Sequence, residues 1–314
     1  MRVVIAGGSG LIGRALTESL LRDGAEVEIL TRDPARAGRL VARGARALAW
    51  QPGDDTALED LGRALAGADA VVNLSGIPVG PLPWTPWRRR SIFDSRVTST
   101  RTLVDGMGRL DPAARPRVFV CASGIDGYTG LDAAPATESS DTSGTTGFLA
   151  AVGRAWESAA LGAEVLGVRV VLLQTAFVLA RGSGLLGLLA LPVRLGLGGR
   201  YGSGNQWFSW VHLDDLVGAY RLALTDASVS GPLIAAAPEP CRQLDLAAAL
   251  ARVLHRPNRM RVPGWLLRLL LREESTLLLG SRRVVPVRLI SAGFTFRYPD
   301  VEVALRDALS PQDR

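Results

Sequence analysis

The chain has no lysine, since all 36 residues counted as lysine plus arginine are arginine. It also has only two cysteines and two histidines among 314 residues. Any catalytic motif that requires a lysine is therefore excluded. Two cysteines do not make a disulfide framework, and no group of histidine, cysteine and glutamate has the spacing of metal ligands, so we expect no metal site.

Long hydrophobic runs and clustered charge are also scarce. The most apolar stretch, residues 184–199, is interrupted by Pro192 and Arg194 and is too short to span a bilayer. The net charge is +6, and the basic residues are scattered apart from one arginine run at Arg88–Arg90. This scatter argues against nucleic-acid binding, which requires a basic patch. The chain begins directly with a strand pattern and shows no signal peptide, so a cytoplasmic protein without a membrane partner is expected.

Strand and helix patterns alternate through the first half of the chain. Short connections of this kind predict an α/β fold of the Rossmann type, a doubly wound parallel sheet with right-handed crossovers. The strands are expected at 3–6, 26–31, 45–50, 70–74, 118–122 and 168–173, and the helices at 11–22, 58–66, 87–108 and 148–162.

The second half is less regular and predicts a small C-terminal substrate-binding lobe. We expect a nucleotide-binding domain at 1–175, with residues 176–314 forming mainly this lobe and interleaved with the Rossmann core. A short helix and a loop over the sheet edge are expected at 182–204. Further helices are expected at 212–224, opened by Asp214 or Asp215 as N-cap, and at 244–254, 265–271 and 301–309.

A glycine-rich turn follows the first strand. Gly7, Gly10 and Gly13 have the spacing of a dinucleotide-binding turn, in which the first permits the tight turn, the second admits the pyrophosphate and the third allows close helix packing. The helix that begins at Leu11 would direct free N–H groups at the phosphates. The alternative is a glycine-rich turn without a ligand.

The end of the second strand indicates which dinucleotide binds. An NAD site places an acidic residue there, whereas this chain has Thr31 and Arg32. A guanidinium suits a 2′-phosphate, so NADP(H) is favoured. Asp33 comes one residue late and is expected to cap the turn that contains Pro34. The alternative is that Arg32 is a solvated strand-end residue.

With these residues placed, the chain resembles one group of atypical extended short-chain dehydrogenase/reductases, often named epimerase family or sugar-nucleotide-epimerase-like proteins. The resemblance is nearly full-length, and its most specific segments lie at 194–217 and 277–305. It implies phosphate contacts at 7–13, including Ser9, Leu11 and Ile12. It further implies a 2′-phosphate clamp at Thr31 and Arg32, and cofactor contacts at Leu74, Ser75, Gly76 and Arg96. For Arg96, an exposed helix arginine is the alternative.

The resemblance also defines what is missing. Conventional relatives use a serine after the fifth strand together with a Tyr-x-x-x-Lys pair. Ser123 occupies the serine position, but Phe148 or Leu149 takes the place of the tyrosine, and Val152 or Gly153 that of the lysine. None of these can transfer a proton.

Substitute groups are expected just after the fifth strand. Tyr128 could act as an acid and Asp126 lies nearby, although a loop tyrosine and a turn residue are the alternatives. Gln174 stands where the group usually has arginine, and Phe177 adds apolar bulk, which hints at a less charged and more hydrophobic substrate than a sugar nucleotide.

Other pocket and histidine positions have structural alternatives. Gln206 and Trp207 are expected in the pocket wall, with aromatic core packing as the alternative. His212 is expected to pack or cap, and His255 to be structural.

Three functions compete. The first is an NADP(H)-dependent oxidoreductase or epimerase-like enzyme that acts on a small organic carbonyl or hydroxyl compound. The second is a non-redox cyclase, isomerase or dehydratase on the same scaffold, and the third is an NADPH-binding regulatory module. The helices at 87–108 and from 148 could pack in a homodimer. Fold alone does not choose among these functions.

Overall fold

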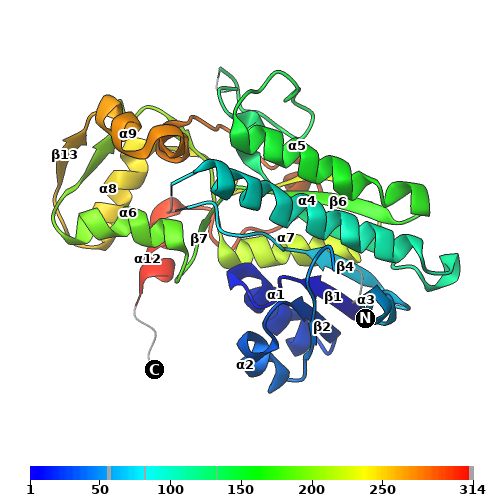
Figure 1. The fold of residues 1–314 in the computed structure, drawn as a ribbon. Helices are drawn as coiled ribbons and strands as arrows, with labels where there is room; N and C mark the ends of the chain where they lie inside the picture. Colours follow the sequence, from blue (N-terminus) through cyan, green and yellow to red (C-terminus); the bar gives the residue numbers. More distant parts are fainter. Residues whose placement is uncertain (55–57, 81–82, 132, 311–314) are drawn as a thin grey trace.

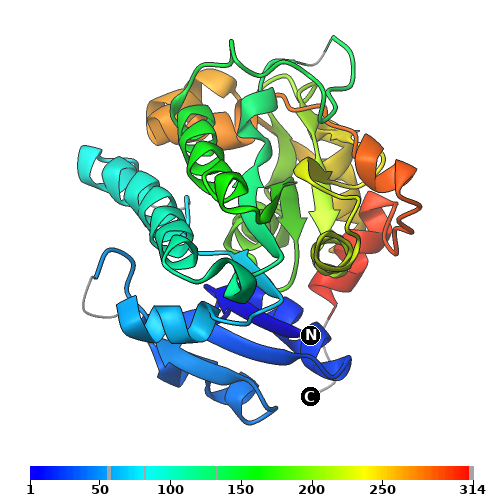
Figure 2. The ribbon, with the colours of Figure 1, turned by 90° about the vertical axis from the view of Figure 1, so that its right-hand side faces the viewer.

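A seven-stranded parallel sheet forms the centre of the protein (Figure 2). The computed structural model describes residues 1–54, 58–80, 83–131 and 133–310. The strand order is β11-β6-β5-β4-β1-β2-β3, which confirms the doubly wound Rossmann-type fold. The strands are β1 (Arg2–Ala6), β2 (Glu26–Thr31), β3 (Arg46–Ala49), β4 (Ala70–Asn73), β5 (Val118–Gly124), β6 (Arg169–Thr175) and β11 (Gly231–Ala235).

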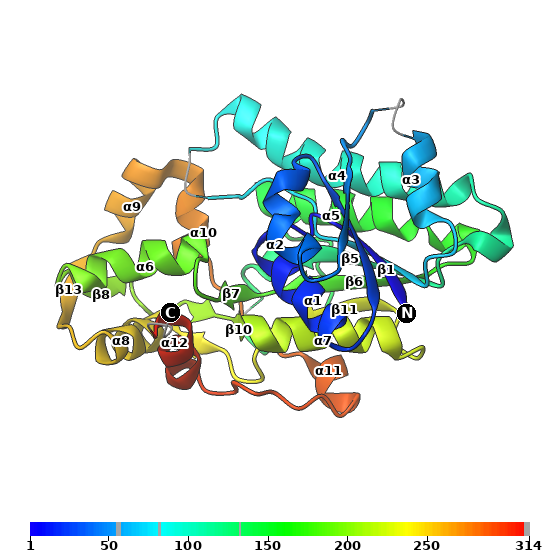
Figure 3. The same cartoon turned by 90° about the horizontal axis from the view of Figure 1, so that it is seen from below.

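Helices cover both faces of this sheet (Figure 3). One face packs α1 (Leu11–Arg22) and α7 (Leu213–Thr225), and the other packs α3 (Leu58–Leu65), α4 (Pro86–Gly108) and α5 (Phe148–Leu161). The strands are continuously apolar because their successive side chains enter opposite cores: Val3 and Ile5 point to the first core, and Val4 to the second. Two short helices, α2 (Gly38–Val41) and α11 (Val287–Ser291), complete the first face.

A lobe with its own hydrophobic core lies at one end of the sheet (Figure 1). Its helices are α6 (Gly184–Arg194), α8 (Gln243–Val253), α9 (Gly264–Leu271), α10 (Thr276–Leu279) and α12 (Val301–Leu309). Three two-stranded sheets join them: β7 (Phe177–Leu179) with β10 (Trp210–His212), β8 (Gly198–Tyr201) with β13 (Asn258–Val262), and β9 (Trp207–Phe208) with β12 (Cys241–Arg242).

The structure contains elements that the sequence did not predict, among them the short paired strands of the lobe and the helices α2, α10 and α11, and it corrects one predicted helix cap. The seventh strand, β11, was not expected and pairs with β6. The 182–204 region contains strand β8 in addition to a helix. The N-cap of α7 is His212, whose Nδ1 accepts from the Asp214 N–H at 3.2 Å, so the expectation of an aspartate cap was wrong.

No helix within the described ranges is both long enough and apolar enough to cross a membrane.

Candidate functional site

Gly7 and Gly13 of the glycine turn leave no room for a side chain. Gly7 has φ +79°, and a Cβ there would lie 2.9 Å from the Leu74 carbonyl carbon. A Cβ on Gly13 would lie 2.5 Å from the Cα of Gly8, so this glycine packs against the turn itself. Gly10 is the N-cap of α1 and offers no side chain to the first N–H groups of the helix. The turn therefore has the backbone cradle and the free helix N-terminus that a dinucleotide pyrophosphate requires.

A cavity of about 580 Å³ opens beside this turn. It lies at the carboxyl edge of the sheet, where β1 and β4 are neighbours and the strand order reverses. Its wall includes residues that follow the strands β1, β4, β5 and β6, and residues of the lobe, among them Gly10, Leu74, Asp126, Ala176 and Trp207. The turn and the lobe thus face one shared space.

The end of β2 presents one arginine to solvent. The Thr31 hydroxyl lies 3.1 Å from the Ser9 hydroxyl and is buried. Asp33 accepts from the Ala35 N–H at 3.1 Å, which confirms its capping role. Arg32 is exposed, and its guanidinium has no acidic partner among the described residues. Its charge is therefore available to an anionic ligand.

Arg96 is held in the cavity wall beside the loop that follows β4. Its Nη1 donates to the carbonyl oxygens of Ile77 and Ile92, each at 3.1 Å. Its guanidinium carbon lies 5.2 Å from the Trp156 ring centroid, and a Cβ on Gly76 would lie 3.1 Å from that carbon. Burial lowers the pKa of Arg96 to about 10. The alternative of an exposed helix arginine is wrong.

Leu74 and Ser75, the two expected cofactor contacts before Gly76, lie in the loop that follows β4. Leu74 lines the cavity. The Ser75 N–H donates to the Asn73 side chain at 3.0 Å, which fixes the loop at the end of β4.

A polar network lies behind the cavity, at the end of β5. The Ser123 hydroxyl donates to Glu157 Oε1 at 2.7 Å, and the amide nitrogen of Gln174 donates to the same oxygen at 2.9 Å. The Tyr128 hydroxyl donates to Gln174 Oε1 at 2.7 Å. Ser123 and Gln174 donate to Glu157 directly, and Tyr128 is joined to it through Gln174, so the network is arranged around the Glu157 carboxylate.

Three expected site residues, Ser123, Tyr128 and Gln174, belong to this network, are buried and do not line the cavity. Tyr128 is 2% exposed, and burial, followed by the charges of Glu157 and Glu138, raises its pKa. Its proton is committed to Gln174, which is itself buried, so the expectation that the side chains of Tyr128 and Gln174 face the substrate is corrected.

Asp126 does line the cavity. Its carboxylate forms an ion pair with Arg282 at 2.8 Å, and Arg282 also lines the wall. This places one carboxylate from the Rossmann part against one guanidinium from the C-terminal part.

Some of the expected lobe residues line the cavity and one does not. Phe177 and Trp207 line the cavity. The Trp207 ring is stacked by Arg242 and Arg283, whose guanidinium carbons lie 3.7 and 4.3 Å from its centroid. The Gln206 amide instead donates to the backbone carbonyl of Tyr201 at 3.1 Å, so this residue supports the wall and does not form it.

Helix α5 shows what replaces the missing Tyr-x-x-x-Lys pair. Leu149 lines the cavity, and a Cβ on Gly153 would lie 3.9 Å from the Ser123 hydroxyl, so these are the positions that face the site. Phe148 and Val152 do not line the cavity and pack in an apolar cluster to which Leu149 also belongs. Glu157 follows one helical turn after Gly153, on the same face. Sequence reasoning missed this residue, although the four-residue spacing from Leu149 and Gly153 would have pointed to it.

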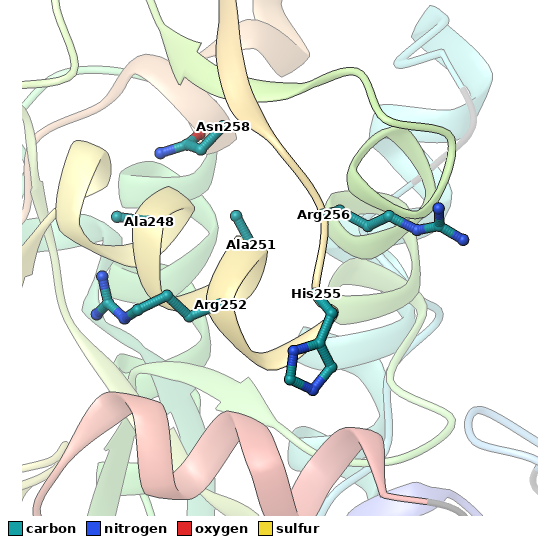
Figure 4. Close-up of a pocket in the computed structure, with 6 residues that line it drawn as sticks. All are labelled: Ala248, Ala251, Arg252, His255, Arg256 and Asn258. Atoms are coloured by element: carbon teal, nitrogen blue, oxygen red, sulfur yellow. The ribbon is translucent and has the colours of Figure 1, made fainter.

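Two other groups of titratable side chains among the described residues lie apart from this cavity. A hollow of about 450 Å³ lies at the end of α8, where Arg252, His255 and Arg256 point away from one another (Figure 4). His212 is buried against the Tyr298 ring and caps α7, as its position suggested. No group of His, Cys, Asp and Glu within the described residues could hold a metal ion.

A parallel sheet with a glycine turn and a ligand cavity at its reversal point defines a Rossmann-type nucleotide-binding protein. Comparison with known proteins gives the family. Residues 3–234 match the NAD dependent epimerase/dehydratase family, and residues 262–308 match a domain of unknown function, DUF1731. The chain belongs to this epimerase/dehydratase family, within the atypical extended short-chain dehydrogenase/reductases.

Individual relatives extend over the full chain. It is 36% identical over 307 residues to the chloroplastic SDR39U1 homologue of Arabidopsis thaliana, covering 98% of this chain and 86% of that one. It is 33% identical to an epimerase family protein of Staphylococcus haemolyticus, with 98% of each chain covered. The crystal structure of human epimerase family protein SDR39U1 (isoform 2) with NADPH superimposes with a TM-score of 0.83 at 29% identity, covering 98% and 99% of the two chains.

Proposed function

We propose that the protein is an NADP(H)-dependent oxidoreductase or epimerase-like enzyme that acts on an organic carbonyl or hydroxyl compound. One observation carries the proposal: a single cavity is lined by the glycine turn that suits the dinucleotide and by the lobe that would hold a substrate. When bound, the dinucleotide supplies or accepts a hydride.

The preference for NADP(H) rests on Arg32. The end of β2 carries a buried threonine hydroxyl and an exposed arginine, where an NAD site would carry a carboxylate. A guanidinium can bond a 2′-phosphate through two parallel N–H groups. The NADPH bound to the human relative agrees with this assignment.

The proton is handled by Ser123 and Glu157. Ser123 is the second-last residue of β5 and is buried, and Ile125 and Asp126, which follow this strand, line the cavity. Because its hydrogen is directed at Glu157, its oxygen is free to accept a hydrogen bond from a substrate hydroxyl. As that hydroxyl is oxidised, its proton passes to the Ser123 oxygen while the serine proton passes to Glu157. Reduction of a carbonyl reverses both transfers. Glu157 thereby takes over the role left by the missing tyrosine and lysine.

Calorimetric titration with NADPH and NADH tests the cofactor assignment. Arg32→Ala should weaken NADPH binding about 10- to 150-fold, the loss expected for hydrogen bonds to a charged group, and leave NADH binding unchanged. Arg109→Ala removes an equally exposed arginine at the far end of α4 and should change neither affinity. Failure of the wild-type protein to bind either dinucleotide would remove the redox proposal.

A non-redox isomerase or dehydratase is the second candidate. It is favoured by Asp126, a carboxylate on the cavity wall that could move protons without any hydride transfer. Substrate turnover that continues with no change in NADPH absorbance would select this candidate, whereas NADPH consumption that depends on substrate would exclude it.

A further inference from the structure

A second cavity of about 620 Å³ lies between the lobe and the loop that follows β4. Helices α6, α9 and α10 lie together on this side of the lobe (Figure 3). The side chains that line the cavity are mostly apolar and include Val79, Pro83, Leu185, Leu188, Leu270 and Leu277. A space of this volume and lining suits the apolar part of a small molecule.

The two cavities adjoin. Val79, Gly184, Leu185 and Leu277 contribute to the walls of both. A molecule whose reactive end lies in the cofactor cavity can therefore extend past these residues into the apolar space.

The charges in the walls disfavour a nucleotide-sugar substrate. In the apolar cavity the charged lining residues among those described are Arg272 and Glu274, and the Glu274 carboxylate already accepts from the Trp84 N–H. In the cofactor cavity Arg96 bonds backbone carbonyls and Arg282 is paired with Asp126. Apart from the pyrophosphate that the glycine turn suits, a second diphosphate group would thus find few uncommitted cations, and burying it without them is costly.

We infer that the substrate is amphipathic, with a carbonyl or hydroxyl group near Ser123 and a long aliphatic tail in the apolar cavity. The inference rests on the proposed function for the position of the reactive end. Each methylene that enters the cavity should tighten binding about three- to fourfold, until the space is filled.

Straight-chain methyl ketones from butanone to dodecanone are the probes. Their affinities would be measured by calorimetry, with and without saturating NADPH. Gly184 begins α6 at the junction of the cavities, and a Cβ there meets no atom within 4 Å, so Gly184→Leu can fold and narrow the passage. Gly187→Leu is the matched control, because this exposed glycine of the same helix has equally open surroundings and lines neither cavity.

The expected result is an affinity that rises with chain length in the wild-type protein and in Gly187→Leu. In Gly184→Leu the rise should stop at short chains, with a loss of at least tenfold for dodecanone and none for butanone. Equal affinity for all ketones, or a rise that survives in Gly184→Leu, would overturn the inference. Ketone binding is measured with and without NADPH, so the two proposals can fail separately. If the ketone affinity depends on chain length but the protein binds no dinucleotide, the redox proposal is refuted and the inference about the tail is not.

Discussion

Replacing Glu157 by glutamine should destabilise the folded protein, because its carboxylate accepts from both Ser123 and Gln174. Hydrogen bonds to a charged acceptor contribute about 1.5–3 kcal/mol each, against about 0.5–1.5 kcal/mol for neutral ones. The two losses together amount to about 2–3 kcal/mol. Since Glu157 is half-buried, solvent reduces this, and we expect a loss of about 2 kcal/mol in the free energy of unfolding.

Urea denaturation followed by circular dichroism measures this loss. Glu164→Gln is the control, because Glu164 is exposed and makes no side-chain bond among the described residues. Combining Glu157→Gln with Ser123→Ala should cost about 1 kcal/mol less than the sum of the single changes, as expected for residues in one network. If Glu157→Gln and Glu164→Gln unfold at the same urea concentration, the network does not stabilise the protein in the way described.

Three further predictions concern the turn, one histidine and the thiols. Gly13→Ala should lower the free energy of unfolding by about 1–3 kcal/mol and abolish dinucleotide binding in calorimetry, whereas Gly62→Ala, in an open helical position, should stabilise by about 0.5–1 kcal/mol. Burial lowers the pKa of His212, so the stability that its neutral ring contributes is present above its unfolded pKa of about 6.5 and is lost as the pH falls below it. Melting temperatures between pH 5 and 8, compared with those of His212→Asn, would show this, and parallel curves would contradict it. Burial raises the pKa of both Cys121 and Cys241 to about 12, so a thiol reagent should label the native protein far more slowly than the denatured one. Rapid native labelling would disprove this shielding.

Regular elements with strong periodicity were predictable from the sequence. The predicted bounds of α1, β2 and α12 agree with the structure because each has a clear apolar pattern and a recognisable end. Strand β11 was missed because it is short and contains Pro232, which is tolerated there since β11 lies at the sheet edge. The paired strands of the lobe are as short as β11 or shorter, and they show no period that a sequence could reveal.

Within the site, sequence reasoning could predict the local backbone conformation but not the directions of the side chains. The glycine turn is a local feature, so its position could be read from the spacing of Gly7, Gly10 and Gly13. The direction of the Tyr128 and Gln174 side chains depends on Glu157, which is distant in sequence from both and approaches them only when α5 packs on the sheet. Such pairings arise from tertiary packing and leave no local pattern.

The pairing of β6 with β11 leaves one edge of β6 without a partner strand until β11 has been synthesised. Residues 169–175 are synthesised well before residues 231–235, so β6 is an open edge while the first part of the lobe is still being made. An exposed parallel edge rich in valine and leucine favours self-association. A fragment that ends at residue 175 should therefore aggregate, whereas a fragment that extends through β11 covers the open edge of β6. During synthesis about 60 further residues must follow residue 175 before β11 can pair with β6.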